Sequence, residues 1–423
     1  KQTGSFYTPR SIVDYMVDES LKAYLLKPLT VEAGMSVGDA QAGLDLLFSY
    51  EEEDSESIFE PEQVDVLIRA IDQCKILDPA CGSGAFPMGI LQKLVHILAK
   101  LDPLNIKWEE RQKAALTTIT DIKERREREY EVARDFRDND DDYGRKLYLI
   151  ENCLYGLDIQ SIATQVSKLR FFISLVVDQK IDRAKENFGV RPLPNLETKF
   201  VTADTLIAAE QPEAQAQLSE LTEVQKLKDA LQDVRHKIFS VQTTKAKQGH
   251  KETDARLREQ IAAELKANGW PDDSADRLAK WDPYKQNESA DFFDPEWMFG
   301  LKGFDVVIGN PPYISVEKFA DTPIQKKWKQ SFETYMPRGD IYCFFYERGA
   351  QLLKNGGCLV FITSNKWMRA GYGKGLRSFL SSKVDTESVR DFGMAQNFSA
   401  ATTNTCITRF NNQKPDDRVF SCD

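Results

Sequence analysis

Residues 304–313 of the 423-residue chain read Phe-Asp-Val-Val-Ile-Gly-Asn-Pro-Pro-Tyr. The apolar, β-branched run predicts a buried strand that stops at a glycine, followed by a stiff loop. Asn310 offers a side-chain carbonyl as an acceptor, and Pro311 offers a backbone carbonyl without an N–H group. Two such acceptors can take both N–H bonds of an amine on a planar ring, and Tyr313 adds an aromatic face. The stretch therefore predicts either a site for an amino-bearing ring or an ordinary turn after a buried strand.

The rest of the chain repeats this alternation of short apolar runs and helical patterns. Strands are predicted at 75–77, 153–157, 199–202, 304–308, 357–363, 384–392 and 403–410, and helices at 8–26, 87–100, 107–136, 159–177, 341–354 and 369–381. Strands that alternate with helices form a mostly parallel sheet that is covered on both faces. We therefore expect an α/β fold around a sheet of about seven strands.

Two segments interrupt the alternation. Residues 31–62 are acidic and predict an irregular excursion on the surface. Residues 209–298 are rich in Glu, Lys, Gln and Ala, and predict a helical hairpin with a polar link at 242–251, inserted between the third and fourth strands. The expected organisation is a first catalytic part (1–208), the insertion (209–298) and a second catalytic part (299–423).

Polar residues stand where the first four predicted strands end. They are Asp78, Asp158, Asp204 and Asn310. In open sheets of this kind, ligands bind at the carboxyl ends of the strands. The agreement of four strand ends on one edge predicts a single binding site there.

The loop at 78–84 joins the first strand to a helix. Gly82 and Gly84 allow tight turning and close approach of the backbone to a ligand. The loop lacks the Lys-Ser/Thr of a P-loop and the spacing of a dinucleotide fingerprint. Asp78 at its start would repel a phosphate but attract a cation, such as the ammonium of a methionine moiety.

The next two strand ends suit the remainder of one molecule. Asp158 can accept both hydroxyls of a ribose, and Asp204 can accept the amino group of an adenine. Each aspartate alone is also typical of a helix cap. Together, at successive strand ends, they describe a bound S-adenosylmethionine.

Composition limits the class of protein. A hydrophobic content of 41% and a charged content of 29% are typical of a soluble globular protein. No apolar run approaches the roughly 20 residues that a membrane span needs, so we expect no membrane and a cytoplasmic location. Seven cysteines without paired spacing favour reduced thiols. Three histidines show no metal-ligand spacing, so no metal is expected.

Charge is unevenly distributed. The net charge of −10 argues against a generic nucleic-acid binder. Residues 301–380, however, carry twelve Lys and Arg against six Asp and Glu, a local charge of +6. Their basic residues are interleaved with tryptophans beside the Asn-Pro-Pro-Tyr loop, which fits either a phosphate track near a base pocket or a solvated basic face.

In order and wording, these motifs resemble those of a γ-class adenine-specific DNA methyltransferase. The similarity is to the branch found in fused, type IIG-like restriction–modification enzymes and phage-defence methylases. Residues 4–9 (Gly-Ser-Phe-Tyr-Thr-Pro) resemble motif X, 78–86 motif I, Asp158 motif II, Asp204 motif III, 310–313 motif IV, Asp340 motif V, 364–373 the segment after the fifth strand and 397–405 motif VIII.

The resemblance implies a class I S-adenosylmethionine-dependent methyltransferase with a Rossmann-like fold, and S-adenosylmethionine as its cofactor. The implied cofactor-binding residues are Tyr7, Thr8, Pro9, Asp78, Pro79, Ala80, Gly82, Ser83, Gly84, Phe86, Asp158, Ile159, Asp204, Thr205 and Asn310. The implied catalytic residues are Asn310, Pro311, Pro312 and Tyr313. Tyr313 and Phe398 are expected against the flipped-out adenine, and Lys327, Lys366 and Arg369 against double-stranded DNA.

The family order places target recognition after the catalytic domain, so that domain is expected to be absent from this segment. A nuclease, if the full-length protein has one, is expected outside residues 1–423 or in a partner subunit. The motif at 310–313 alone leaves alternatives open, because protein-glutamine and ribosomal-RNA methylases share it. The alternative function is therefore another amino-methyltransferase, which acts on cytosine N4, RNA or a protein glutamine. A non-catalytic DNA- or cofactor-binding module of a larger machine is a further alternative.

Overall fold

The computed structural model describes residues 8–51, 59–118, 122–137, 141–181, 183–184, 188, 194–209, 222–241, 243–393 and 404–415. Its centre is a seven-stranded sheet in the order β3-β2-β1-β4-β5-β7-β6. The strands are β1 (Ile76–Asp78), β2 (Leu154–Asp158), β3 (Phe200–Thr202), β4 (Phe304–Gly309), β5 (Leu353–Ser364), β6 (Asp385–Asp391) and β7 (Thr405–Asn411). All pairs are parallel except those of β7, which runs antiparallel to β5 and β6. The predicted α/β class I methyltransferase fold is confirmed.

The central strands are buried on both faces. Ile76 of β1 pairs with Leu154 of β2 on one side and Val306 of β4 on the other, and all three are at most 1% exposed. Successive side chains point to opposite faces of the sheet. Ile76 and Val306 accordingly join one hydrophobic cluster, while their chain neighbours Leu77 and Val307 join a second. This double burial explains why the strands read as continuous apolar runs.

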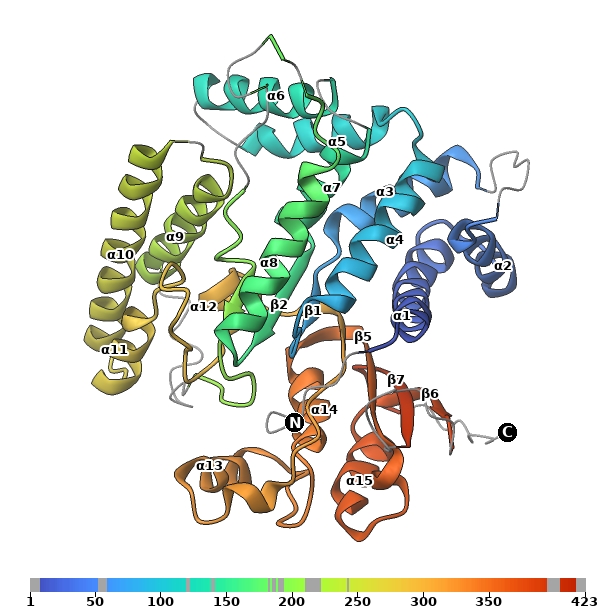
Figure 1. Ribbon diagram of the computed structural model, residues 1–423, viewed down its shortest axis with the longest axis vertical. Helices are drawn as coiled ribbons and strands as arrows, with labels where there is room; N and C mark the ends of the chain where they lie inside the picture. Colours follow the sequence, from blue (N-terminus) through green and yellow to red (C-terminus); the bar gives the residue numbers. More distant parts are fainter. Residues whose placement is uncertain are drawn as a thin grey trace.

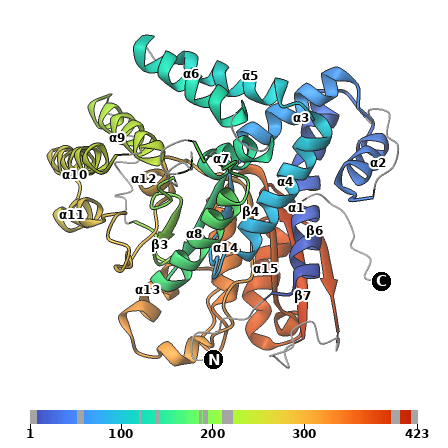
Figure 2. The same ribbon diagram turned by 45° about the horizontal axis from the view of Figure 1, so that its top comes forward.

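Helices cover both faces of the sheet (Figures 1 and 2). The helices before the insertion, some of which pack mainly on other helices, are α1 (Arg10–Val31), α2 (Val37–Phe48), α3 (Pro61–Gln73), α4 (Ala85–Leu101), α5 (Ile106–Ala115), α6 (Ile122–Arg137), α7 (Asp141–Asn152) and α8 (Ser161–Val176). After it come α13 (Pro323–Ser331), α14 (Tyr342–Leu352) and α15 (Lys374–Ser382). No helix among the described residues is both long and apolar enough to cross a bilayer.

The prediction of an irregular excursion at 31–62 is wrong for residues 37–48. Residues Val37–Phe48 form α2, whose start is capped by the Ser36 hydroxyl accepting the Asp39 N–H. Ala40, Leu44 and Leu47 lie on its buried side and belong to the core beside α1 and α4. The acidic residues that surround this stripe are exposed, so the acidic character marks the outer face of a packed helix rather than a loop.

Other boundaries shift by smaller amounts. The expected polar link at 242–251 is much shorter, because α10 begins at Thr244 behind a cap in which the Thr243 hydroxyl accepts the Ala246 N–H. The helix expected at 369–381 begins only at Lys374. Two short 3₁₀ turns, at 365–368 and 371–373, precede it.

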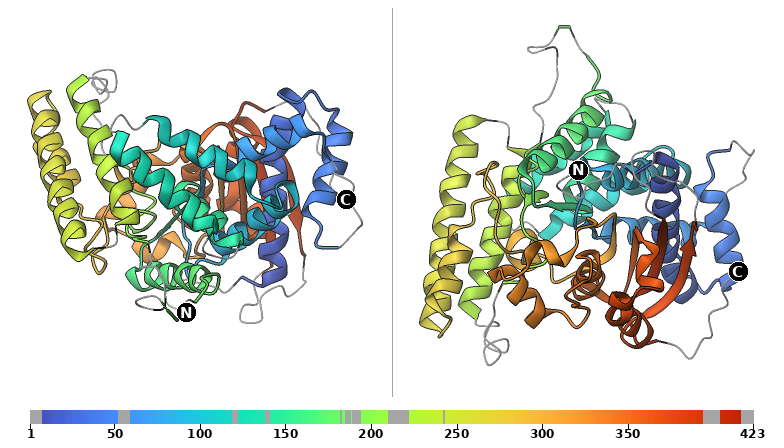
Figure 3. Two further views of the ribbon diagram at one scale, coloured as in Figure 1. Left: turned by 90° about the horizontal axis from the view of Figure 1, so that it is seen from above. Right: turned by 60° about the horizontal axis from the view of Figure 1, so that its bottom comes forward.

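Between β3 and β4, the described residues (200–209, 222–241 and 243–309) form the helices α9 (Thr222–Ser240), α10 (Thr244–Ala267), α11 (Asp272–Lys280) and α12 (Pro295–Phe299). The first three stand side by side at one flank of the molecule, shown in yellow-green (Figures 1 and 3). The short helix α12 returns the chain to the sheet, five residues before β4 begins. The insertion is therefore joined to the strand that carries Asn310.

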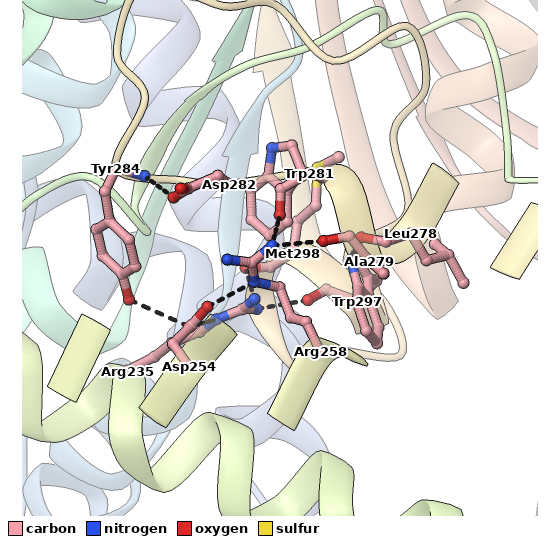
Figure 4. A network of polar contacts seen from close by, with 10 residues as sticks. All are labelled: Arg235, Asp254, Arg258, Leu278, Ala279, Trp281, Asp282, Tyr284, Trp297 and Met298. Carbon is pink, nitrogen blue, oxygen red and sulfur yellow. Dashed lines mark hydrogen bonds and ion pairs between the residues drawn. The ribbon is translucent and has the colours of Figure 1, made fainter. Parts of the chain in front are cut away.

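A buried ionic network holds the insertion together (Figure 4). Asp254 of α10 is fully buried and accepts from Arg235 Nε at 2.9 Å, Arg258 Nε at 2.7 Å and the Tyr284 hydroxyl at 3.1 Å. Arg235 also donates to the Trp297 carbonyl of α12 at 2.6 Å. Because each buried charge meets an opposite charge or a carbonyl, the network links α9 and α10 to the segment that leads into β4.

We expect Asp254→Ala to lower the free energy of unfolding by roughly 3–5 kcal/mol, because it leaves two buried guanidinium groups without their anion. Urea denaturation followed by circular dichroism measures this loss. Asp229→Ala, at an exposed site on α9, is the matched control and should change stability by less than about 0.5 kcal/mol. Equal effects of the two substitutions would show that the network is not stabilising.

Candidate functional site

The ends of β1, β2, β3 and β4 meet at a pocket, as the strand-end residues predicted. Its lining residues are Thr8, Pro79, Ala80, Cys81, Gly82, Ser83, Ala85, Phe86, Asp158, Ile159, Gln160, Ala203, Asp204, Thr205, Leu206, Asn310, Pro312, Ile314, Phe319, Ile324, Trp328, Ile341 and Phe345. Most of the residues expected to bind the cofactor are among them. Tyr7 and Phe398 lie outside the described residues.

Some predicted residues do not line the pocket. Pro9, Asp78, Gly84, Pro311 and Tyr313 are not among the lining residues. Asp78 is 1% exposed, and its Oδ1 accepts the Ala80 N–H at 3.1 Å while its Oδ2 has no hydrogen-bond partner. Burial raises the pKa of this carboxyl well above its usual range. Asp78 thus holds the start of the loop at 78–84, hereafter the cofactor loop.

The cofactor loop is clamped from two sides. Asp158 accepts the Gly82 N–H at 2.9 Å and the Gln160 N–H at 2.8 Å. From α8, the Ser167 hydroxyl donates to the Gly82 carbonyl at 2.9 Å and Arg170 donates to the Ser83 carbonyl at 3.0 Å. Burial raises the pKa of Asp158, and the backbone N–H groups oppose that rise. Ser167 and Arg170 had no recognisable signal in the sequence.

The third strand end forms a second wall. Asp204 Oδ1 accepts the Leu206 N–H at 3.0 Å, and burial raises the pKa of this carboxyl. The Thr205 hydroxyl donates to the Pro79 carbonyl at 2.7 Å. This hydrogen bond ties the segment after β3 to the loop after β1, so the two walls have a fixed separation.

Asn310 is hydrogen-bonded to Thr8, which precedes the first helix. Its Nδ2 donates to the Thr8 hydroxyl at 3.2 Å, and Thr8 is 5% exposed. The Asn310 Oδ1 is buried and has no hydrogen-bond partner among the described residues. A buried carbonyl oxygen without a donor is costly, by about 1–3 kcal/mol. The arrangement therefore offers an acceptor to an N–H group that enters the pocket.

Tyr313 is held in a fixed orientation beside this acceptor. Its hydroxyl donates to the Ile362 carbonyl of β5 at 3.4 Å, and its ring meets Tyr342 edge-on with centroids 5.8 Å apart. The Tyr342 and Tyr372 hydroxyls are 2.8 Å apart. The Tyr313 ring is therefore restrained by contacts at both its hydroxyl and its edge.

An apolar wall of the pocket was missed from the sequence. Ile314, Phe319, Ile324 and Trp328 come from the segment between β4 and α14, and Phe345 comes from α14. In the sequence this segment stands out for its basic residues, which concealed the apolar side. Lys327, Lys366 and Arg369 are exposed, whereas Trp328 and Trp367 are 3% and 5% exposed. The basic segment is thus two-sided, with cations outward and tryptophans inward.

Asp340, at the position that resembles motif V, lies just before α14. Its backbone bridges to Ser315, and its Oδ1 is buried without a hydrogen-bond partner. Burial raises the pKa of Asp340 to about 6, against the opposing effect of nearby backbone N–H groups. Within the described residues, no group of three or more His, Cys, Asp or Glu side chains could hold a metal ion.

Comparison with known sequences assigns the chain to a family. A match to the Eco57I restriction-modification methylases covers residues 152–398, more than half of the chain. The chain belongs to this family. Membership of this methylase family implies S-adenosylmethionine as the cofactor.

The individual relatives are longer than this methylase. The predicted type II restriction enzyme and methyltransferase RM.MjaORFECS2P of Methanocaldococcus jannaschii is 24% identical over 433 residues, covering 89% of this chain and 32% of the relative. RM.Eco57I of Escherichia coli is 34% identical over 119 residues, covering 28% and 12%. The chain thus spans about a third or less of these relatives. The type IIL restriction-modification enzyme MmeI, solved with DNA, is 12% identical with a TM-score of 0.43, covering 97% of this chain and 37% of that one.

We expect Gly84→Ala to weaken S-adenosylmethionine binding on the order of tenfold. Gly84 has a φ of +78°, and an added Cβ would lie 2.9 Å from Ser167 Oγ. The left-handed conformation costs a side chain roughly 1–2 kcal/mol, and the contact would push the loop off α8. Isothermal titration calorimetry measures the affinity. Gly371→Ala, where no atom lies within 4 Å, is the control and should bind normally; unchanged affinity at Gly84 would contradict the rigid-loop interpretation.

Proposed function

We propose that this chain is the catalytic part of a DNA adenine-N6 methyltransferase of a restriction–modification or phage-defence system. The observation that carries the proposal is the buried, unpartnered Oδ1 of Asn310, at the end of β4 in the same pocket as the cofactor loop. An exocyclic amine has the two N–H donors that this oxygen and the neighbouring Pro311 carbonyl can accept. Adenine carries such an amine, and the family description concerns methylation.

The residues present fit S-adenosylmethionine. Asp158 and Asp204 place carboxylates at neighbouring strand ends for ribose and adenine groups, and the apolar wall around Phe345 suits a flat ring. The buried Asp78 does not line the pocket, and its carboxyl instead holds the Ala80 N–H at the start of the loop that does. When bound, this cofactor supplies an electrophilic methyl group.

The side chains of the chain itself activate the amine. Acceptance of both N–H bonds by Asn310 Oδ1 and the Pro311 carbonyl draws the nitrogen from planar toward tetrahedral geometry and concentrates its lone pair. Thr8 holds the Asn310 amide so that its oxygen, and not its nitrogen, faces the amine. Positioning and electrostatics then supply most of the rate.

A covalent cysteine mechanism does not suit this site. Cys81 is buried, and burial raises the pKa of its thiol well above its usual range. A thiol nucleophile needs its thiolate form. Direct transfer to an amine therefore fits better than attack on a cytosine ring carbon.

Reaching an adenine within a duplex requires extrusion of the base. Unstacking costs roughly a few kcal/mol, and stacking on an aromatic ring returns about 1–3 kcal/mol. The restrained ring of Tyr313 is a suitable platform. The exposed Lys327, Lys366 and Arg369 belong to the basic segment that follows the Asn-Pro-Pro-Tyr loop, where phosphates of a bound duplex would pass.

We expect Asn310→Ala to abolish methylation, with a loss of at least about a hundredfold in kcat, because an acceptor that acts in the transition state is removed. Binding of S-adenosylmethionine should stay within a few-fold of wild type. Tritiated methyl transfer to duplex DNA measures the first quantity and calorimetry the second. Nucleoside mass spectrometry identifies the product of the wild-type protein. If the product is N4-methylcytosine, or if only RNA or protein is labelled, that substrate replaces adenine in the proposal. Full activity of Asn310→Ala would refute the proposed role of Asn310.

Lys327→Gln and Lys366→Gln should each weaken DNA binding and reduce the slope of log affinity against log salt by about one unit. Fluorescence anisotropy with a labelled duplex at several salt concentrations provides both values. Lys280→Gln on α11 removes the same charge from an exposed position of the insertion and serves as the control. If all three variants behave alike, the basic segment is only a solvated face.

A further inference from the structure

Arg348 of α14 is a buried cation outside the pocket lining. It is 8% exposed, and its guanidinium joins three separate segments of the chain. Nε donates to the Thr205 carbonyl at 3.0 Å, one terminal nitrogen donates to the Phe293 carbonyl at 2.9 Å, and the other to Gln351 Oε1 at 3.3 Å. Thr205 follows β3, whereas Phe293 lies at the exit of the insertion.

These hydrogen bonds continue into the pocket. Thr205 lines the pocket, and its hydroxyl donates to the Pro79 carbonyl of the cofactor loop at 2.7 Å. On α14, Phe345 stands three residues before Arg348, on the same side of the helix, and also lines the pocket. One guanidinium therefore sets the distance between α14, the segment after β3 and, through Thr205, the loop after β1.

Arg348 also acts on Asp204 through its charge. Burial lowers the pKa of Arg348 to about 10, so it stays a cation at neutral pH. Burial raises the pKa of Asp204, and the Asp291 carboxylate adds to the rise. The Leu206 N–H, Arg277 and Arg348 oppose it. The cation thus favours the ionised form of Asp204, which is the form that accepts N–H donors with both oxygens.

We propose that Arg348 is a positioning residue of the cofactor pocket, which holds segment 203–206 as the wall that receives the adenine of S-adenosylmethionine. It acts through Thr205 and Asp204 and does not touch the cofactor. The inference rests on the proposed function, since the pocket must bind this cofactor. It also gives the insertion a role, because the carbonyl of Phe293, near the end of the insertion, is one of the three acceptors of the Arg348 guanidinium.

The shape and the charge of the Arg348 side chain contribute separately to the position and the charge of the pocket wall. The planar guanidinium donates in several fixed directions at once, whereas a lysine ammonium is a single point at the end of a flexible stem. Arg348→Lys therefore keeps the charge but loses the fork, and Arg348→Met loses both. Arg258 is the matched control, since it is 5% exposed and also donates to two backbone carbonyls, those of Ala279 and Trp281 at the end of α11, within the insertion.

The test is the Kd for S-adenosylmethionine as a function of pH, measured by calorimetry on the folded variants. Affinity should fall as pH drops through the pKa of Asp204. Arg348→Met should raise Kd on the order of tenfold at high pH and move the midpoint of this fall upward, because Asp204 loses a neighbouring cation. Arg348→Lys should raise Kd while leaving the midpoint near that of wild type. Arg258→Met should lower Tm without changing either quantity.

Asp204→Asn checks the titrating group. Asp158 also has a pKa raised by burial and continues to titrate, so part of the acid fall in affinity remains, but the upward shift of its midpoint caused by Arg348→Met should disappear in the Asp204→Asn background. Unchanged Kd and midpoint in Arg348→Met and Arg348→Lys overturn the inference, as does an equal rise in Kd for Arg258→Met. A midpoint shift by Arg348→Met that persists in the Asp204→Asn background overturns it as well. A wild-type protein that fails to bind S-adenosylmethionine instead refutes the proposed function, so the two failures are distinguishable.

Discussion

The burial of the central strands on both faces is the constraint on which the rest of this structure depends. β1 and the adjoining half of β4 pair on both sides within the sheet and face a hydrophobic core above and below it. Such strands tolerate polar side chains only where they end. Asp78 and Asn310 therefore emerge at one edge of the sheet, where parallel pairing brings them beside Asp158 and Asp204. The chemistry of the site is a consequence of where the apolar runs stop.

That edge is then made rigid by hydrogen bonds between segments that are distant in the sequence. Thr8 precedes the first helix yet orients the amide of Asn310 at the end of β4. Asp158 and the α8 side chains clamp the cofactor loop, and Thr205 fastens it to the next strand end. Because these bonds use buried or half-buried donors and acceptors, each one both orders the pocket and would be costly to break.

Buried arginines connect segments outside the pocket to one another and to the pocket wall. Arg235 and Arg258 join the insertion helices around Asp254, and Arg348 joins the exit of the insertion to the pocket wall. A guanidinium group can satisfy several backbone carbonyls at once, which suits irregular segments that lack a sheet or helix partner. These hydrogen bonds connect the insertion to the segment that leads into β4, although the helices of the insertion lie at the flank of the molecule (Figure 3).

The sequence by itself determined the alternation of strands and helices, the strand ends and the residues on them, because apolar runs and turn residues report local structure directly. It misjudged α2, where buried Leu44 and Leu47 stand among acidic residues that face solvent. It could not predict the clamp from Ser167 and Arg170, the apolar wall around Trp328 or the bridge by Arg348. Only the tertiary structure decided these features. Each depends on contacts between residues that are far apart in the sequence, and no local sequence pattern predicts such contacts.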